Sequence, residues 1–396
     1  MELHHDVVEH ILEKLPVKSL LRFKLVSVQW NFIIESQYFK KKNLIYRQSQ
    51  DPDILILYPR EYNDDHPIRI LTMSSSDLIK LPILFPPCKK THFENYPLLR
   101  VYRYSVSGSC DGMLCYYNHA NCIYVVNPVT RWFRNVPQAR YQAVVLDTLN
   151  RERWKFMNDH AQLCSLGFGK DKFTGTYKLV WLYNSFEISL ENTTTCEVFD
   201  FSTNTWKYVT AAPCRILNHH IPVHLDGSLH WFTDESIGET RILSFNFHTE
   251  TFHIVLKTPF PEAPSSYSKN IVMCNLNDRL SVSQKKWLRQ EIWSLNNSDM
   301  IWEKIYSLNL DPQLFRNFPP TALIPNAILC VTPVTVLKKT KSLVLFDTLT
   351  HVGNRKFTIY DPELRSYDAC SHNERYAGHY STVVPFTPSL ISIVEE

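Results

Sequence analysis

The stretch LEKLPVKSLLRFKLVSVQW, residues 12–30, decides how the start of this chain folds. Its apolar residues recur at helical spacing, and so do those just before it. One face of a first helix is predicted from Val7, Val8, Ile11, Leu12 and Leu15. A segment of about 40 residues lacks the volume for a self-sufficient core. Its surplus apolar surface must therefore be covered by the rest of the chain or by another protein.

Helix boundaries can be placed within this segment from a few residues. Asp6 followed by Glu9 is typical of a capping box that starts the first helix. Pro16 ends that helix and suits the first turn of a second, over residues 17–25. Ser27 is the expected N-cap of a third helix. The sequence therefore predicts three short helices that form a compact hook.

The order of the residues between Leu15 and Trp30 resembles the F-box of plant F-box proteins. The matching pieces are Leu15–Leu20, Arg22–Lys24 and Val26–Trp30. The resemblance implies docking on an SKP-type adaptor, which links the chain to a cullin scaffold with its RING subunit and to a ubiquitin-conjugating enzyme. Carried over by position, the adaptor contacts are Leu3, Val7, Val8, Ile11, Leu12, Leu15, Pro16, Leu20, Leu21, Val26 and Trp30. The family usually has Leu-Pro before the first helix, where this chain has Leu3-His4.

An alternative is that the helices only cap the rest of the chain. Helical periodicity by itself leaves these two interpretations open. The ordered motif favours the adaptor, and a structure with Leu12, Leu15 and Trp30 sealed beneath the remainder of the chain would favour the cap.

Composition excludes several classes of function. The chain has 396 residues, 44% hydrophobic and 20% charged, with a net charge of +3, so no strong field for nucleic acid or a membrane follows. Its ten cysteines contain no C-x-x-C pair, which favours buried thiols in a reducing compartment. We therefore expect a cytoplasmic or nuclear protein.

Beyond residue 42 a β-rich unit recurs, in which a short apolar strand ends in Asn or Asp and an aromatic residue follows six positions later. The Asn or Asp side chain fixes a turn, and the aromatic residue packs on the outgoing strand, as in a β-hairpin. The five pairs are Asn127 with Phe133, Asp200 with Trp206, Asn246 with Phe252, Asn296 with Trp302, and Asp361 with Tyr367.

The spacing of these units predicts a β-propeller-like domain, because blades typically repeat every ~40–50 residues. A β-sandwich is the alternative, since repeated hairpins do not prove ring closure. Three segments, at 109–114, 166–169 and 227–231, also resemble the F-box-associated domain of the same plant family, which is considered kelch-like. The expected organisation is α+β and multidomain: a three-helix F-box over residues 1–42, a linker over 43–53 and a large all-β domain over 54–396.

Several residue groups could suggest chemistry, and each has a plainer explanation. Four histidines are close in sequence but lack the spacing of a metal site. The segment Gly167-Phe168-Gly169 lacks the rest of a phosphate loop, so we expect this segment to be a strand-entry turn. Asp200 and Asp361 resemble paired acids but share a turn position in the repeat. The histidines are His219, His220, His224 and His230. Ser109-Cys110-Asp111 lacks a nucleophile elbow. No catalytic, metal or cofactor site is expected.

The resemblance implies a substrate-recognition subunit of an SKP-cullin-F-box ubiquitin ligase. The helices would hold the adaptor, and the β domain would hold a target protein whose identity the sequence does not name. Such a receptor acts by proximity, raising the effective concentration of a target lysine near the ubiquitin thioester. The alternatives are an adaptor-binding protein outside any ligase and a propeller enzyme with acids, His or metal ligands at one mouth of the ring.

Overall fold

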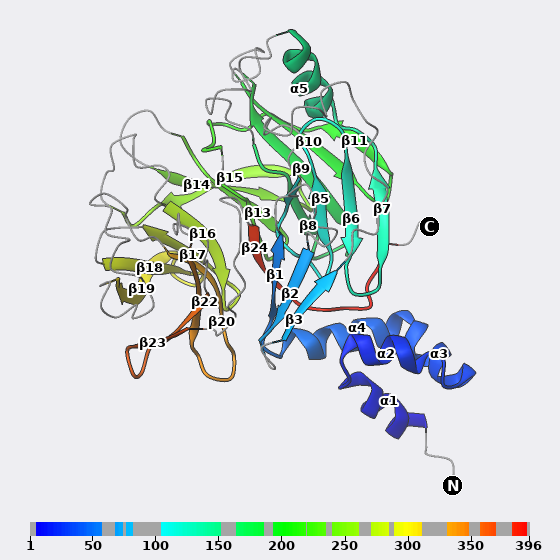
Figure 1. Ribbon diagram of the computed structural model, residues 1–396. Coiled ribbons are helices and arrows are strands. Elements are labelled where there is room, and N and C mark those ends of the chain that lie inside the picture. Colours follow the sequence, from blue (N-terminus) through cyan, green and yellow to red (C-terminus); the bar gives the residue numbers. More distant parts are fainter. Residues whose placement is uncertain are drawn as a thin grey trace.

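The computed structural model describes residues 5–57, 68–73, 77–81, 104–151, 164–185, 193–218, 220–234, 240–260, 271–284, 289–310, 331–347, 357–369 and 382–393. A small helical module stands below a large β domain (Figure 1). The module contains α1 (His5–Glu13), α2 (Val17–Phe23), α3 (Val28–Glu35) and α4 (Gln37–Gln48).

The prediction of three helices is wrong by one, because α4 follows α3 after a single residue. Ser27 caps α3 as predicted, and its side chain accepts a hydrogen bond from the Trp30 amide at 3.1 Å. Ser36 caps α4 in the same way, accepting from the Phe39 amide at 3.1 Å. This second cap was readable from the sequence, and α4 occupies the first part of the expected linker.

The module has a core of its own. Leu12, Val17, Leu20, Ile33, Ile34 and Phe39 are buried together. Polar contacts hold α4 across α1: the Lys42 Nζ lies 2.8 Å from a Glu9 oxygen and 3.2 Å from a Glu13 oxygen, and Asn43 donates to the Glu13 carbonyl at 2.8 Å. The four short helices therefore form one compact unit.

The β domain is a six-bladed propeller of four-stranded antiparallel sheets (Figure 1). We number the blades in chain order from the sheet that contains β1. Blade 1 holds β24 (Thr382–Phe386), β1 (Asp53–Leu57), β2 (Ile68–Thr72) and β3 (Asp77–Leu81), and blade 2 holds β4 (Ser105–Val106), β5 (Leu114–Tyr117), β6 (Ile123–Asn127) and β7 (Trp132–Val136). Blade 3 holds β8 (Gly167–Lys170), β9 (Tyr177–Asn184), β10 (Thr194–Asp200) and β11 (Thr205–Tyr208).

The other three blades follow the same order from the inner to the outer strand. Blade 4 holds β12 (Val223–Leu225), β13 (Ser228–Phe232), β14 (Arg241–Asn246) and β15 (Thr251–Lys257). Blade 5 holds β16 (Ile271–Leu276), β17 (Arg279–Gln284), β18 (Arg289–Asn296) and β19 (Ile301–Asn309). Blade 6 holds β20 (Val331–Val336), β21 (Leu343–Asp347), β22 (Phe357–Asp361) and β23 (Ser366–Ala369).

The ring is closed by strands from opposite ends of the chain. β24 pairs antiparallel with β1, with Leu55 opposite Val384, and so becomes the inner strand of blade 1. Inner strands of neighbouring blades also touch, from β8 through β12, β16 and β20 to β24. A closed ring of six sheets confirms the propeller and makes the β-sandwich alternative wrong.

The predicted repeat is the turn between the third and fourth strands of blades 2 to 6. In every copy the side-chain oxygen of the Asn or Asp accepts from the backbone amide two residues later, at distances from 2.8 to 3.1 Å. The aromatic residue pairs across the hairpin with the residue just before the Asn or Asp. In blade 3, for example, Trp206 pairs with Phe199. The residue four positions after the Asn or Asp has a positive φ in each copy, from 51° to 64°. These residues are Arg131, Asn204, Glu250, Met300 and Arg365.

Three of these aromatic residues also join neighbouring blades. The Trp206 Nε1 donates to the Pro137 carbonyl at 2.7 Å, which ties blade 3 to the end of blade 2. The Trp302 Nε1 donates to the Lys257 carbonyl at 2.8 Å, and the Tyr367 hydroxyl donates to the Asn309 carbonyl at 2.9 Å. Phe133 and Phe252 occupy the same position without a donor. We use the name aromatic latch for the hydrogen bond that the aromatic side chain donates to a carbonyl at the end of the preceding blade.

The expectation of an all-β domain is wrong at one place, where α5 (Arg140–Arg151) follows blade 2. Tyr141, Val145 and Leu149 are buried beneath it. Glu197 of β10 accepts from the amides of Arg140 and Tyr141, at 2.9 Å each, and so holds the start of the helix. α5 lies at the end of the propeller opposite to α1–α4 (Figure 1), and we call that end the distal face.

Candidate protein-binding surface on the helical module

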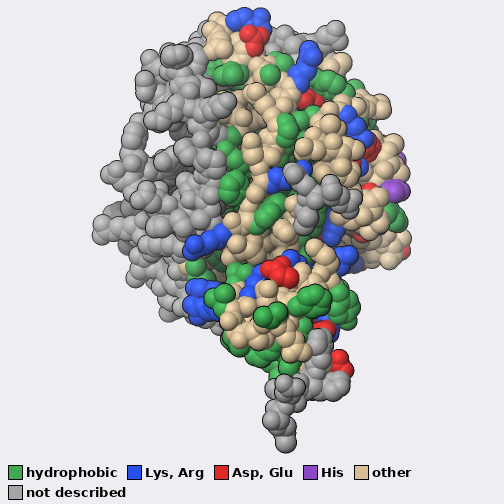
Figure 2. Space-filling model, turned by 90° about the vertical axis from the view of Figure 1, so that its right-hand side faces the viewer, with side chains coloured by type: hydrophobic (Ala, Val, Ile, Leu, Met, Phe, Trp, Pro, Cys, Tyr) green, Lys and Arg blue, Asp and Glu red, His purple; other side chains and the backbone are tan. Residues whose placement is uncertain are grey.

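Large apolar side chains remain exposed on the helical module although its core is already filled. Among the predicted contacts, Val7 is 46% exposed, Ile11 50% and Val26 60%. The sequence prediction did not include Leu25, Val28 and Phe32, which are 90%, 88% and 77% exposed. Figure 2 shows apolar side chains on the outside of this module. We call these six residues the apolar surface.

The other predicted contacts divide into buried and intermediate positions. Leu12 and Leu20 lie in the module's own core, so the structure does not leave them accessible, and they support the surface from beneath. Four more are partly buried against that core: Val8, Leu15, Leu21 and Trp30. Pro16 is exposed, and Leu3 lies outside the described residues. The core that covers Leu12 consists mainly of the module's own helices, so the side chains of the cap hypothesis are not sealed beneath the propeller.

The missed residues carried a weak sequence signal. Leu25 and Val26 follow the last turn of α2, and Val28 and Phe32 lie one turn apart on α3. The helical stripe of Trp30, Ile33 and Ile34 faces the core, so the opposite face of α3 presents Val28 and Phe32. Apolar residues on both faces of α3 are the signal that could have identified them, because only one face of a short helix can meet the core of the module.

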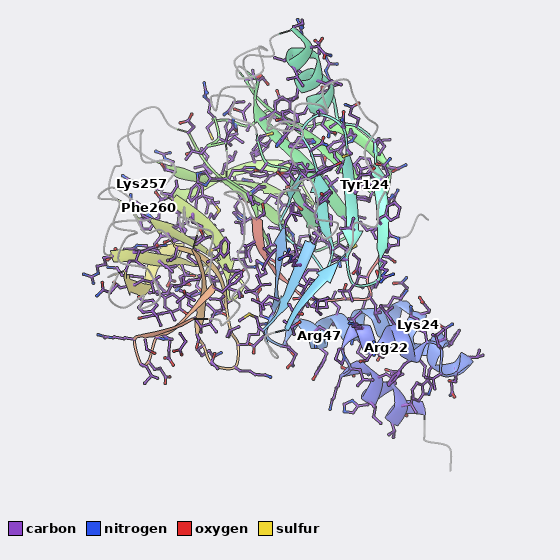
Figure 3. The ribbon with its side chains drawn as sticks, in the orientation of Figure 1. Arg22, Lys24, Arg47, Tyr124, Lys257 and Phe260 are labelled. Atoms are coloured by element: carbon purple, nitrogen blue, oxygen red, sulfur yellow. The ribbon has the colours of Figure 1, made fainter. Side chains whose placement is uncertain are left out.

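Ion pairs frame this surface. Glu35 binds Lys24 and Lys40, and these two hydrogen bonds lower the pKa of its carboxyl group. Arg22 and Lys24 project from the same part of the module (Figure 3). An apolar surface with a charged rim is typical of protein interfaces.

Residues at the end of α4 and just after it bind the helical module to the propeller. Leu44 of α4 is buried in the core of blades 2 and 3. Gln48 donates to the Asp111 carboxylate at 3.3 Å, and this same carboxylate accepts from Lys170 and Tyr177 of blade 3, at 2.8 and 2.7 Å. Asp51 accepts from the Lys338 amide of blade 6 at 2.5 Å. α4 and Asp51, three residues beyond its end, therefore contact blades 2, 3 and 6, with blade 3 reached in part through the Asp111 side chain.

The end of the chain runs between the module and blade 2. After β24, Ser389 and Leu390 are buried, and Leu390 packs into the core of the helical module beside Leu12 and Phe39. The Asn127 Nδ2 donates to the carbonyls of Ser389 and Ile391, at 3.0 and 2.9 Å. We call residues 387–393 the tail.

Close packing of the tail explains one glycine. Gly112 has a φ of +75°, and a Cβ added there would lie 2.5 Å from the Ser389 Oγ and 2.6 Å from the Thr387 carbonyl oxygen. The Ser389 hydroxyl donates to the Asp111 carbonyl at 2.6 Å. A side chain at position 112 would therefore displace the tail.

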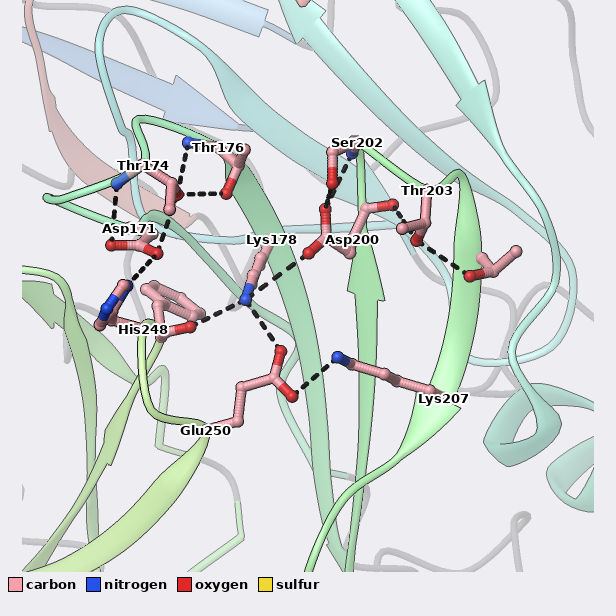
Figure 4. A network of polar contacts seen from close by, with 12 residues as sticks. Asp171, Thr174, Thr176, Lys178, Asp200, Ser202, Thr203, Lys207, His248 and Glu250 are labelled. Atoms are coloured by element: carbon pink, nitrogen blue, oxygen red, sulfur yellow. Dashed lines mark hydrogen bonds and ion pairs between the residues drawn. The ribbon is translucent and has the colours of Figure 1, made fainter.

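A polar network around the buried Lys178 joins blades 3 and 4 (Figure 4). The Lys178 Nζ donates to the Phe247 carbonyl and the Glu250 carboxylate, at 2.8 Å each, and lies 3.5 Å from Asp200. Lys207 binds the second Glu250 oxygen at 2.8 Å. Burial raises the pKa of Glu250, but the bonds from both lysines outweigh it, so the pKa is lowered. This network holds the blade junction where Phe252 provides no aromatic latch.

The residues weighed for chemistry have structural roles. Asp200 and Asp361 hold turns in blades 3 and 6. Burial lowers the pKa of His230 to about 4 and also lowers that of His224, while His219 lies outside the described residues. Within the described ranges no three His, Cys, Asp or Glu are placed to hold a metal ion.

Two other motifs also have packing roles. Gly167 and Gly169 belong to strand β8 and not to a strand-entry turn, and a Cβ on them would collide with Leu229 and His224. Cys110 is buried, which raises its thiol pKa well above the ordinary value. A thiol held in its neutral form is a poor nucleophile.

The cysteines depart in one respect from the expected free thiols. Six of the described cysteines are free, and four of these are buried: Cys110, Cys115, Cys164 and Cys196. Cys122, however, is disulfide-bonded. In the part of the chain that the structure describes, no helix is long and apolar enough to cross a membrane.

Comparison with known proteins connects both parts of the chain to one family. Residues 1–42 match the F-box domain, and residues 73–393 match the F-box associated beta propeller domain. An F-box/LRR-repeat/kelch-repeat protein of Arabidopsis thaliana is 43% identical over 399 residues, covering 99% of this chain and 97% of that protein. A second Arabidopsis thaliana F-box protein is 42% identical, covering 99% of this chain and 85% of its own length.

Solved structures show only a distant likeness. A chain in the crystal structure of a nidogen–laminin complex has a TM-score of 0.44 and 11% identity, covering 84% of this chain and 98% of that one. The family assignment comes from the sequence matches, which span the helical module and the propeller alike. The chain belongs to the F-box proteins that carry an F-box associated β-propeller domain.

Proposed function

We propose that this protein is the substrate-recognition subunit of an SKP-cullin-F-box ubiquitin ligase. The observation that carries the proposal is the apolar surface, which stays exposed on an F-box module whose core is already filled. Covering these side chains would contribute ~1.5–3 kcal/mol for each one fully buried. Ordering and association costs offset a large part of that gain.

In this proposal the propeller holds the target protein. The helical module lies at one end of the ring, and we assign the target protein to the other end, the distal face with α5 (Figure 1). The chain would supply no reacting group and would act by holding a target lysine near the ubiquitin thioester. The plain structural roles of Asp200, Asp361 and Cys110 support this view.

Affinity purification of the full chain from plant cells with the proteasome inhibited tests the proposal. We expect an SKP-type adaptor, a cullin and a ubiquitinated target to be recovered together. Phe32→Asp should abolish adaptor recovery, because it places a charge on the apolar surface. Leu364→Asp is the matched control, since Leu364 is 76% exposed on blade 6, away from the module.

Two outcomes would contradict the proposal. Recovery of the adaptor without cullin would favour an interaction protein outside the ligase. Undiminished recovery of the adaptor with folded Phe32→Asp would refute the assigned surface.

A further inference from the structure

The F-box of this chain is not built from the N-terminal residues alone. Leu390, which lies more than 350 residues further along the chain than Phe39, is 4% exposed and packs within the same cluster. Val129, from the turn of blade 2, packs against that cluster as well. The adaptor-binding module therefore takes a core side chain from the far end of the chain.

Blade 2 supplies the hydrogen bonds that hold the tail in place. Asn127 donates to two tail carbonyls, Ser389 donates to the Asp111 carbonyl, and Ile391 and Ile393 pack into the core of blades 2 and 3. The strand that precedes the tail, β24, closes the ring. Ring closure and the seating of Leu390 thus depend on the same twelve described residues, 382–393.

From this arrangement we infer that the tail is a positioning element for adaptor binding: only a closed propeller seats Leu390 and so gives the F-box its binding shape. This inference rests on the proposed function. Exposed Ile11 and Phe32 lie on helices that pack over the cluster containing Leu390. Helices that lose a core contact sample other arrangements, and apparent affinity falls by the fraction of chains that remain competent. Chains with an unfinished propeller would then be poor partners for the adaptor.

Asn127→Asp tests the inference with little change to the fold. Aspartate holds the same turn at positions 200 and 361, so the acceptor for the Val129 amide is kept. The two donations to the tail are lost, and a carboxylate then faces two carbonyl oxygens. Asn246→Asp makes the same exchange in the equivalent turn of blade 4, outside the tail's contacts.

We expect full-length Asn127→Asp to bind purified SKP-type adaptor at least about tenfold more weakly than wild type, a difference of about 1.4 kcal/mol. Asn246→Asp should bind like wild type. Leu390→Asp should show a larger loss, and Leu390→Met should restore most of the affinity because it fills a similar volume. Hydrogen exchange should rise in α1–α3, with the propeller strands unchanged.

The outcomes separate this inference from the proposed function. If wild type binds the adaptor and Asn127→Asp binds equally well, the inference is wrong and the proposed function stands. If wild type does not bind the adaptor, the proposed function fails, and hydrogen exchange still decides whether the tail orders α1–α3. Faster exchange across all blades would mean that the tail only stabilises the whole fold, which would also overturn the inference.

Discussion

Asp53, the first residue of β1, is a carboxyl group buried at the joint between the helical module and the propeller. Burial raises its pKa to about 6, against the opposing charge of Arg47 and a backbone hydrogen bond with Met73. Figure 3 shows Arg47 at the end of α4 that meets blade 1. The folded protein therefore binds a proton on Asp53 more tightly than the unfolded chain does.

This shift predicts a pH-dependent gain from Asp53→Asn. Above pH 6 the native state carries an ionised buried carboxylate, so its removal should stabilise the protein by about 3 kcal/mol at pH 7.5. The gain should shrink as the pH falls through 6 towards 4, because the wild-type carboxyl group is then protonated in the folded state. Thermal unfolding at pH 7.5 and pH 5 measures the difference, with exposed Asp278→Asn as the control. A loss of stability at both pH values would show that the attraction to Arg47 dominates.

Single residues also set the limit of sequence reasoning. Ser27 could be assigned as a cap because its partner lies three residues away. Leu12 and Leu20 were assigned to the adaptor, yet they face inward, because a helical stripe does not say which side meets the core. The role of Leu390 depends on a contact across most of the chain, for which no local pattern exists.

Among the elements, the hairpin between the third and fourth strands was the part of the propeller that the sequence predicted best. Its turn and its aromatic pair are local, so five copies could be read directly. The aromatic latch could not be predicted, since the Trp206 Nε1 reaches a carbonyl 69 residues earlier in the chain. α5 was missed although Tyr141, Val145 and Leu149 recur at helical spacing.

The aromatic latch predicts that Trp206→Phe costs about 1 kcal/mol of unfolding free energy, the typical net value of one hydrogen bond. Phenylalanine already occupies this position in blades 2 and 4, so the ring itself fits. Urea unfolding measures the loss. Tyr208→Phe in the same strand is the control, because Tyr208 is 53% exposed. Equal stability of Trp206→Phe and wild type would mean that water replaces the latch.

The junction of blades 3 and 4 predicts a larger effect for Lys178→Met, about 3 kcal/mol, because the change removes a buried cation from the partly buried carboxylates of Asp200 and Glu250, and only Glu250 keeps another, Lys207. Lys207→Met is the control: Lys207 binds the same Glu250 but is 49% exposed, so its loss should cost less than about 1 kcal/mol.

The junction of blades 3 and 4 should also make the stability of the protein depend on pH in acid. The pKa values of Asp200 and Glu250 are lowered in the folded state: burial acts to raise both, but the hydrogen bonds and the lysine charges outweigh it. Their contribution is complete above the pKa of the unfolded chain, near pH 4 to 4.5, and is lost as the pH falls further. Denaturant titrations between pH 6 and pH 3 should show a weaker acid dependence in Lys178→Met than in wild type. An unchanged dependence would exclude the network as its source.

On the scale of the whole molecule, removal of residues 1–42 should leave a folded propeller. The pairing of β1 with β24 lies outside the deletion, and so does Leu44, which packs into blades 2 and 3. The fragment would expose Leu390, so we expect it to associate, and Leu390→Ser in the fragment should restore a monomer. Circular dichroism and sedimentation measure the two effects. A fragment without cooperative unfolding would show that the helices are needed to stabilise the ring.

The pairing of the first strand of the ring with the last also constrains how the protein is made. On a ribosome, β1 emerges roughly 330 residues before β24, which is about 15 to 65 s at ~5–20 residues per second. During that time one edge of an apolar strand, Asp53–Leu57, has no partner, and such edges recruit other chains. A chaperone that shields this one strand during that time would protect the chain from such pairing.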